Sequence, residues 1–229
     1  RKFKDPLSQK IYDTCVHTLV CCMHEHYEDC PWREQALYTM DSRNQMLAGY
    51  YAFGETLFPK ANLELISEDD RPDGLLSICY PIKRNMAIPS FSLHFVTECE
   101  EYLRYSKDVD FIRSIYPKIK KTLQVFLDRL DDKGLTTPIR GNDMWNFYEW
   151  EDGLDGVGPW ERDVRGEECY DYDLVLNSLI SVAVSRMISI NSILGCDSFD
   201  LLRVKEKLNF AIKDHFYNAE RGLFETRNG

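Results

Sequence analysis

A segment near the N-terminus, HEHYEDCPWREQALYTMDSR, concentrates ionisable and aromatic side chains around one proline. Asp29, Arg33, Glu34 and Asp41 fall within thirteen residues, and Tyr38 lies among them. Carboxylates and a guanidinium can bind hydroxyl groups, while an aromatic ring can cover the CH face of a sugar. Two carboxyl groups, one acting as an acid and the other as a base or nucleophile, can also hydrolyse a glycosidic bond. The segment therefore suggests a pocket for a polyhydroxylated ring.

Two other interpretations of this segment need fewer of its residues. His24 and His26 are two positions apart, so on a helix their side chains point about 200° away from each other. Helical zinc sites use spacings of three or four residues, so we expect no metal site here. Alternatively, Pro31 could begin a helical turn that one of the two preceding residues caps, with Glu34 in its first turn. This capping interpretation stays open, although it accounts for only part of the cluster.

A second acidic and aromatic cluster, MWNFYEWEDGLDG, lies in a long connection between expected helices. Long connections inside a compact domain usually have a function. We expect Glu149 and Trp150 to form a second wall of the same pocket. For Glu151, Asp152 and Asp155 a solvated loop is the better interpretation, with one of the Trp residues anchoring the loop to the core.

Composition narrows the classes of partner. The chain has 229 residues, with 28 basic and 38 acidic residues and a net charge of −10. This charge argues against a nucleic-acid partner, and we expect no apolar run near the length needed to span a membrane. The sequence contains no GxSxG motif and no Gly-rich phosphate loop, so we expect no cofactor.

The eight cysteines of the chain include no CxxC pair. Buried free thiols in a reducing compartment, the cytoplasm, are the expected state.

Apolar residues recur with helical spacing through most of the chain, which predicts an all-α fold. Asp5 and Asp108 are expected to cap helices, and short connections alternate with long ones. This rhythm of antiparallel helical hairpins is typical of an (α/α)6 toroid, of which one partial domain, 1–229, would form about half. The expected helices cover 5–27, 41–58, 62–68, 90–105, 108–130, 168–194 and 198–217. Within the helix over 108–130 we expect a kink or a break at Pro117. An extended connection is expected over 75–90 and a long connection over 135–166.

The motif DCPWREQALYTMDSR resembles the bacterial α-L-rhamnosidases of glycoside hydrolase family 78, whose catalytic domain is a six-hairpin (α/α)6 barrel. The segments FYEW and LFETRNG are similar to later landmarks of that family, so the resemblance covers nearly the whole chain. It implies inverting hydrolysis of terminal α-L-rhamnosides, with two carboxyl groups roughly 6.5–9.5 Å apart.

The resemblance also implies roles for individual residues. Glu34 matches the general acid, which requires a raised pKa, and Asp29, Arg33 and Asp41 match groups that hold the sugar hydroxyls. Tyr38 stands where the family usually has Trp. Glu149 stands where Asp is usual, next to Trp150, and both changes alter the reach of the side chain.

The family's general base is a Glu from the later half of the barrel, and this chain ends before any match to it. We therefore expect the remainder of a parent chain to complete the barrel. The chain alone is expected to be inactive and prone to self-association through uncovered apolar faces. Two alternatives stay open: a six-hairpin hydrolase acting on another sugar, such as one from a glycan containing uronic acids, and a non-catalytic helical interaction domain.

Overall fold

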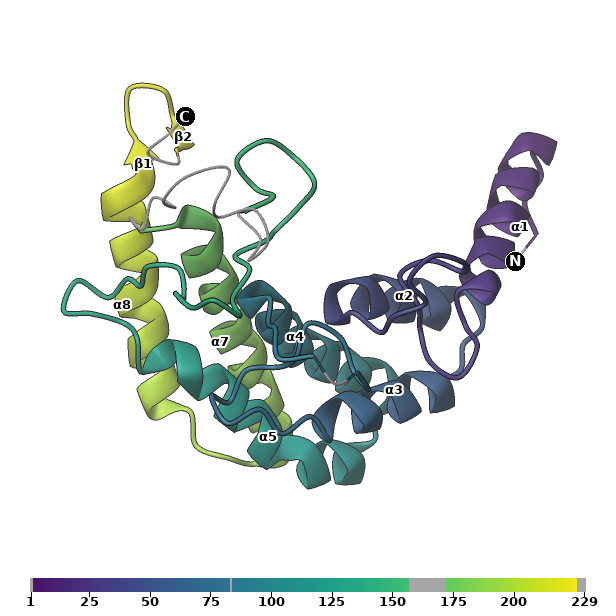
Figure 1. Cartoon of the computed structure of the whole chain (residues 1–229), viewed down its shortest axis with the longest axis horizontal. Helices are drawn as coiled ribbons and strands as arrows, with labels where there is room; N and C mark the ends of the chain where they lie inside the picture. The colour runs from purple at the N-terminus through teal and green to yellow at the C-terminus, as the bar shows by residue number, and fades with distance from the viewer. Residues whose placement is uncertain (1, 83, 157–171, 226–229) are drawn as a thin grey trace.

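The computed structural model describes residues 2–82, 84–156 and 172–225. Within these residues the regular secondary structure is helical apart from one short β-hairpin near the end of the chain (Figure 1). The elements are α1 (Pro6–Cys21), α2 (Thr39–Ala52), α3 (Leu57–Ser67), α4 (Pro89–Ser106), α5 (Val109–Leu127), α7 (Leu174–Leu194), α8 (Phe199–Phe216), β1 (Tyr217–Asn218) and β2 (Leu223–Phe224).

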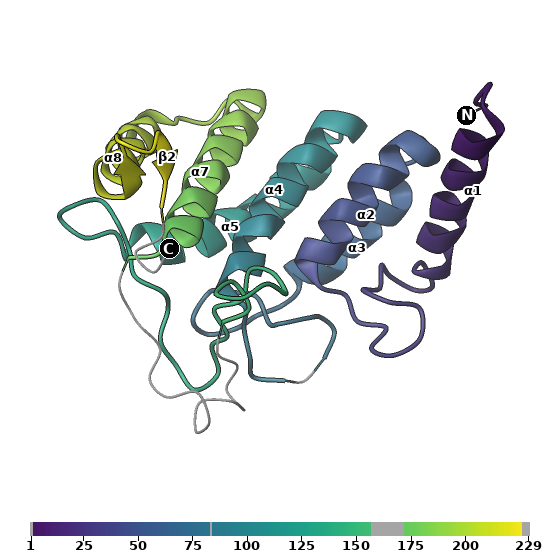
Figure 2. The same cartoon turned by 90° about the horizontal axis from the view of Figure 1, so that it is seen from above.

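The helices form a curved double row. Helices α2, α4 and α7 pack side by side on the concave side of the curve, and α3 and α5 lie on its convex side (Figure 1). Helices α1 and α8 stand at the two ends of the row. Figure 2 shows that the described parts of the three long connections, between α1 and α2, α3 and α4, and α5 and α7, gather at one end of the helices. The predicted all-α fold of hairpins with alternating short and long connections is confirmed.

Side-chain caps fix where several helices begin. A carboxylate oxygen of Asp5 accepts the Ser8 amide at 2.7 Å, and Asp108 accepts the Phe111 amide at 3.0 Å, as the sequence predicts. Asp173 caps α7 in the same way. Each cap satisfies a backbone donor that has no partner within the first helical turn.

Several predicted helix boundaries are wrong. The first helix ends at Cys21 rather than near residue 27, because the chain turns there and Met23 forms a bridge with Tyr27. The helices expected over 41–58 and 62–68 are α2 and α3, but the break between them falls at Gly54, whose φ of +69° ends the helical path. Pro59 therefore lies in the first turn of α3, where a residue without an amide proton is tolerated.

Two predictions for the later helices also change. Helix α5 runs unbroken through Pro117, so it is not two helices meeting there, and it ends at Leu127 rather than at residue 130. Helix α7 begins at Leu174, and the part of the predicted 168–194 helix before residue 172 lies outside the described residues.

The core lies between the two rows, and α4 is its most buried helix. Phe95, Val96 and Cys99 of α4 are fully buried against the neighbouring helices. The ends of the row are different. The helical spacing of Leu7 and Ile11 predicts a buried stripe on α1, but these side chains are 64% and 56% exposed. Among the described helices, α1 packs mainly against α2, which leaves this stripe uncovered.

The sequence of α7 is apolar on most sides, which predicts an interior helix. Val182 and Ile193 are nevertheless exposed, since α4, α5 and α8 cover only part of its surface. By length and composition α7 could also cross a membrane, so the expectation that no apolar run reaches that length is wrong. A partly buried core helix passes the same test. The seven described cysteines are free, but Cys15 is exposed rather than buried.

Arg71 joins two of the long connections that approach the cavity described below. Its side chain is only 5% exposed and forms ion pairs with Asp73 at 2.7 Å and Asp143 at 3.1 Å. It also donates to the Asn85 side chain at 3.0 Å. Beside it, Ala87 donates to the Asp143 carbonyl at 2.9 Å. The guanidinium therefore holds the connection before α4 against the connection after α5.

Replacing Arg71 by lysine is expected to destabilise the protein by about 2 kcal/mol. Lysine keeps the charge, but a single ammonium group cannot reproduce the fork that binds Asp73, Asp143 and Asn85 together. Thermal unfolding measures the loss. Lys121→Arg is a control, because its ion pair with Asp70 is exposed. Equal melting temperatures for wild type and Arg71→Lys would contradict the role given to the fork.

Candidate active site

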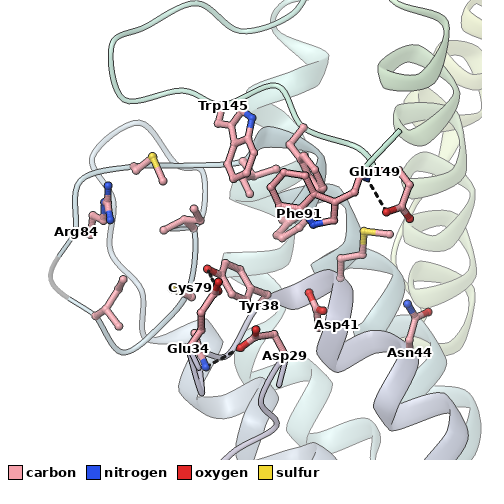
Figure 3. Close-up of a pocket in the computed structure, with 18 residues that line it drawn as sticks. Asp29, Glu34, Tyr38, Asp41, Asn44, Cys79, Arg84, Phe91, Trp145 and Glu149 are labelled. Carbon is pink, nitrogen blue, oxygen red and sulfur yellow. Dashed lines mark hydrogen bonds between the residues drawn. The ribbon is translucent and has the colours of Figure 1, made fainter. Parts of the chain in front are cut away.

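A cavity of about 700 Å³ opens at the end of the helices where the long connections gather. Its walls come from the connection before α2, the first turns of α2 and α4, and the connections before α4 and after α5 (Figure 3). The lining residues are Asp29, Glu34, Ala36, Tyr38, Met40, Asp41, Asn44, Ile78, Cys79, Ile82, Arg84, Met86, Ile88, Phe91, Trp145, Phe147, Glu149 and Trp150.

A compact loop before α2 presents Asp29 and Glu34. Asp29 and Ala36 close this loop, because the Ala36 amide donates to Asp29 Oδ1 at 3.0 Å and the Asp29 amide donates to the Ala36 carbonyl at 3.0 Å. The Glu34 amide donates to Cys30 Sγ at 3.4 Å. These contacts resemble the predicted caps, but residues 31–34 form a turn and α2 begins only at Thr39. Pro31 therefore begins a single turn, as the capping interpretation predicts, but no helix continues from it.

Tyr38 fixes the carboxylate of Glu34. Its hydroxyl donates to Glu34 Oε2 at 2.9 Å, and both side chains face Cys79 in Figure 3. Burial and the hydrogen bond to Glu34 raise the pKa of the Tyr38 phenol, so it keeps its proton and remains a donor. Glu34 itself is exposed to the cavity. An exposed carboxylate held by one hydrogen bond can meet a ligand without first rotating.

Asp41 is the carboxyl group whose proton affinity the site changes most clearly. Burial, followed by the charges of Asp29, Glu34 and Glu149, raises its pKa to about 6. The position of Asp41 in the first turn of α2 favours the ionised form, but burial and like charge outweigh that effect. The other three carboxyl groups of the cavity therefore act electrostatically on Asp41.

Aromatic side chains form the floor of the cavity. Phe91, Trp145 and Phe147 belong to a small hydrophobic cluster that is separate from the main core, and Tyr38 packs against it. Ring centroids of Tyr38 and Phe91 lie 6.1 Å apart, and those of Phe91 and Phe147 lie 6.2 Å apart. The Ser90 hydroxyl donates to the Phe147 carbonyl at 2.6 Å, which ties this floor to α4. The cavity thus has an apolar floor beside a wall formed by Asp29, Glu34 and Asp41, which we call the acidic wall.

The connection after α5 supplies the second wall. The indole N–H of Trp145 donates to the Asp155 carbonyl at 2.8 Å, so Trp145 is the residue that anchors this loop. Trp150 is 74% exposed and packs its ring 4.8 Å from Phe147. Glu149 and Trp150 line the cavity, whereas Glu151 and Asp152 do not. The rest of this connection, 157–166, lies outside the described residues.

Six of the seven residues singled out in the sequence line this one cavity: Asp29, Glu34, Tyr38, Asp41, Glu149 and Trp150. Arg33 is exposed and is not among the lining residues, and its sugar contact stays a prediction. His24 pairs with Glu28 at 2.9 Å, and His26 binds the Tyr27 carbonyl.

Sequence reasoning missed Asn44, Cys79 and Arg84. Asn44 lies one turn after Asp41, and that helical spacing is a signal that could have found it. Cys79 and Arg84 lie in a segment interpreted only as an extended connection. Burial and the charges of Glu34 and Asp29 raise the pKa of the Cys79 thiol to about 11, so it remains protonated at neutral pH.

Residues 2–228 match the family model for the bacterial alpha-L-rhamnosidase 6 hairpin glycosidase domain. No curated protein sequence matches the chain. Among solved structures, the chain is similar to a GH78 family rhamnosidase of Bacillus sp. GL1, with a TM-score of 0.83 and 23% identity over 97% of this chain. It is also similar to a rhamnosidase from Klebsiella oxytoca with rhamnose bound, with a TM-score of 0.80 and 22% identity over 97% of this chain.

The chain spans only 22% of the Bacillus protein and 41% of the Klebsiella protein. At these identities the structural likeness establishes the fold alone. The match to the family model covers nearly every residue, including both segments that carry the carboxylates of the cavity. The chain therefore belongs to the family of bacterial α-L-rhamnosidase six-hairpin glycosidase domains.

Proposed function

We propose that this chain carries the acid side of an active site that hydrolyses terminal α-L-rhamnosides with inversion. Glu34 protonates the leaving oxygen, and Asp29, Asp41 and Glu149 hold the hydroxyl groups of the sugar. Trp150 covers an apolar face of the ring. Arg33 lies outside the described lining of the cavity, and we propose that it also contacts the sugar. The convergence of four carboxylates on one aromatic-floored cavity, in a domain of this family, carries the proposal.

The electrostatics of the cavity favour a neutral sugar at this position. Asp29, Glu34 and Glu149 already act on Asp41 strongly enough to raise its pKa. A fifth carboxylate, as on a uronic acid, would add repulsion in the same space. Rhamnose has hydroxyl groups to donate to carboxylates and a methyl group to place against an aromatic floor. This argument favours rhamnose over the alternative of a six-hairpin enzyme that cleaves uronic acids.

The proposed second catalytic group is a carboxylate from a part of the barrel outside these 229 residues. That part is also proposed to cover the exposed apolar side chains of α1, α7 and α8, including Leu7, Ile11, Val182 and Phe210. The small share of the Bacillus and Klebsiella proteins that the chain spans supports this division. The isolated chain should then be inactive and should self-associate through those faces. The free thiols support the proposed cytoplasmic location.

The direct test uses the natural full-length protein and an aryl α-L-rhamnoside, followed by NMR during the first turnovers. An inverting enzyme releases β-L-rhamnose first, and the α-anomer appears later by mutarotation. Initial release of α-L-rhamnose would reject inversion. If no glycoside is cleaved and calorimetry detects no rhamnose binding, the chain is better explained as the helical interaction domain.

Tyr38→Phe is expected to lower kcat for rhamnoside hydrolysis about tenfold with little change in KM. The variant keeps the ring on Phe91 but removes the hydroxyl that fixes Glu34, and a hydrogen bond to a charged group contributes about 1.5–3 kcal/mol. Steady-state kinetics across pH gives the measurement. Tyr51→Phe is the matched control, because its hydroxyl contacts Tyr105 away from the cavity. If Tyr38→Phe instead raises KM alone, Tyr38 acts as a sugar contact and does not position the acid.

A further inference from the structure

Arg84 is the positively charged side chain among the described residues that line the cavity, and all the other charged side chains of that lining are carboxylates. It is exposed, and it has no hydrogen-bond or ion-pair partner for its side chain within the part of the chain that the structure describes. A guanidinium that is neither buried nor paired is free to bind a ligand. In a chain with a net charge of −10, a guanidinium left without an acidic partner calls for an explanation.

Arg84 lies on the opposite side of the proposed acid from the sugar-binding carboxylates. In Figure 3, Glu34 and Tyr38 stand between Arg84 on one side and Asp41 with Asn44 on the other. A general acid must reach the glycosidic oxygen, which joins the sugar that is cleaved to its leaving group. If the rhamnose occupies the side of Asp41 and Asn44, the leaving group extends toward Arg84.

The surface around Arg84 differs from the rest of the cavity. Ile78, Ile82 and Met86 belong to the same connection as Arg84 and line the cavity with it, and Ile82 is 42% exposed. Met86 is buried in the small hydrophobic cluster, and its amide hydrogen-bonds to the Arg84 carbonyl at 2.9 Å. The backbone that carries Arg84 is therefore fixed, while its side chain projects from an apolar wall. Such a wall can cover the CH face of a second sugar while the guanidinium binds a substituent on it.

Resting on the function proposed above, we infer that Arg84 forms a leaving-group subsite for a carboxylate, as on a uronic acid to which rhamnose is attached. The planar fork of the guanidinium matches the two oxygens of a carboxylate. The three carboxylates beyond Glu34, those of Asp29, Asp41 and Glu149, repel an anion from the rhamnose side, so a negatively charged leaving group can bind in one direction only. The substrate class is then a rhamnosyl uronide, in which the neutral sugar faces the acidic wall and the acidic sugar faces Arg84.

The test compares two disaccharides that differ in one group: α-L-rhamnosyl-(1→4)-D-glucuronic acid and its glucose counterpart. The natural full-length protein should bind the acidic ligand about tenfold more tightly in calorimetry, and added salt should reduce the difference. Arg84→Met should abolish the preference by weakening binding of the acidic ligand about tenfold more than binding of the neutral ligand, while Arg84→Lys should retain part of the preference. Arg203→Met is the matched control, because Arg203 is an exposed guanidinium on α8 outside the cavity lining.

Equal affinity for the two ligands would overturn the inference, and so would an equal loss of both in Arg84→Met. Binding decides this question independently of turnover. Failure of the proposed hydrolysis would appear separately, as the absence of rhamnose release from an aryl rhamnoside that has no carboxylate. A protein that cleaves the aryl rhamnoside but does not distinguish the two disaccharides would keep its proposed function and lose the subsite.

Discussion

Glu34→Gln in the natural full-length protein should lower the hydrolysis of a rhamnoside with a sugar leaving group about a thousandfold. A general acid contributes about 10²–10⁴-fold by protonating the departing oxygen, and glutamine cannot donate that proton. Glutamine does keep the size of the side chain and an oxygen that can accept the hydrogen bond from Tyr38. The local fold should therefore survive, and the loss should appear in kcat rather than in thermal stability.

The leaving group gives a sharper test than the overall rate. A nitrophenolate departs without full protonation, so the same variant should lose much less activity on a nitrophenyl rhamnoside. An equal loss on both substrates would mean that Glu34 binds the sugar and does not act as the acid. Glu25→Gln is the matched control, because Glu25 is exposed in the same segment and does not line the cavity. Its rates should equal those of the wild type on both substrates.

The acidic wall could be predicted from sequence because its residues are close in the chain. Asp29, Glu34 and Asp41 come from one loop and the helix that follows it, so local spacing already indicates a shared site. Glu149 and Trp150 could be added only through a second unusual cluster. Joining the two clusters depends on contacts between distant segments, such as Thr39 to the Phe91 carbonyl at 2.8 Å and Ser90 to the Phe147 carbonyl.

Arg84 shows where sequence reasoning stops. It lies in an apolar stretch interrupted by two prolines, and no helical or alternating pattern assigns its side chain a direction. The contacts of Arg71 with Asn85 and Asp143 place this stretch beside the cavity, and those partners are 14 and 72 residues away in the chain. Arg33 shows the converse, since its position inside the motif did not bring it to the cavity wall.

The predicted helix boundaries are wrong where the helical spacing of apolar residues continues across a break between two helices. Apolar spacing runs smoothly through Gly54, yet the positive φ of that glycine separates α2 from α3. Leu7 and Ile11 have correct helical spacing, but spacing identifies an apolar stripe and does not identify what covers it. The pairing of the helices within the described residues was predictable for this reason, whereas the burial at the two ends of the row was not.

Asp41→Asn should make the protein more stable and less able to bind rhamnose. The pKa of Asp41 is about 6 in the folded protein, above its ordinary value of 3.8. Between about pH 4 and pH 6 the unfolded chain loses this proton while the folded protein retains it, so the folded protein loses stability as pH rises. At neutral pH the group costs the folded state about 2 kcal/mol. Asparagine cannot ionise and should remove that cost.

Thermal unfolding across this pH range measures the gain. The melting temperatures of wild type and Asp41→Asn should be similar near pH 4, diverge up to about pH 6, and stay apart above it. Asp152→Asn is the control, because Asp152 is exposed and lies outside the cavity lining. A difference that does not change with pH would show that the raised pKa is not the source of the stability.

Rhamnose binding should move in the opposite direction. As a carboxylate, Asp41 can accept two hydroxyl hydrogen bonds, and a hydrogen bond to a charged group contributes about 1.5–3 kcal/mol. Calorimetry should therefore show wild-type affinity weakening below about pH 6, as Asp41 gains its proton. Asp41→Asn should bind at least about tenfold more weakly at neutral pH and should lack that pH dependence. If the variant gains stability and keeps full affinity, the burial of Asp41 serves packing of α2 rather than recognition of the sugar.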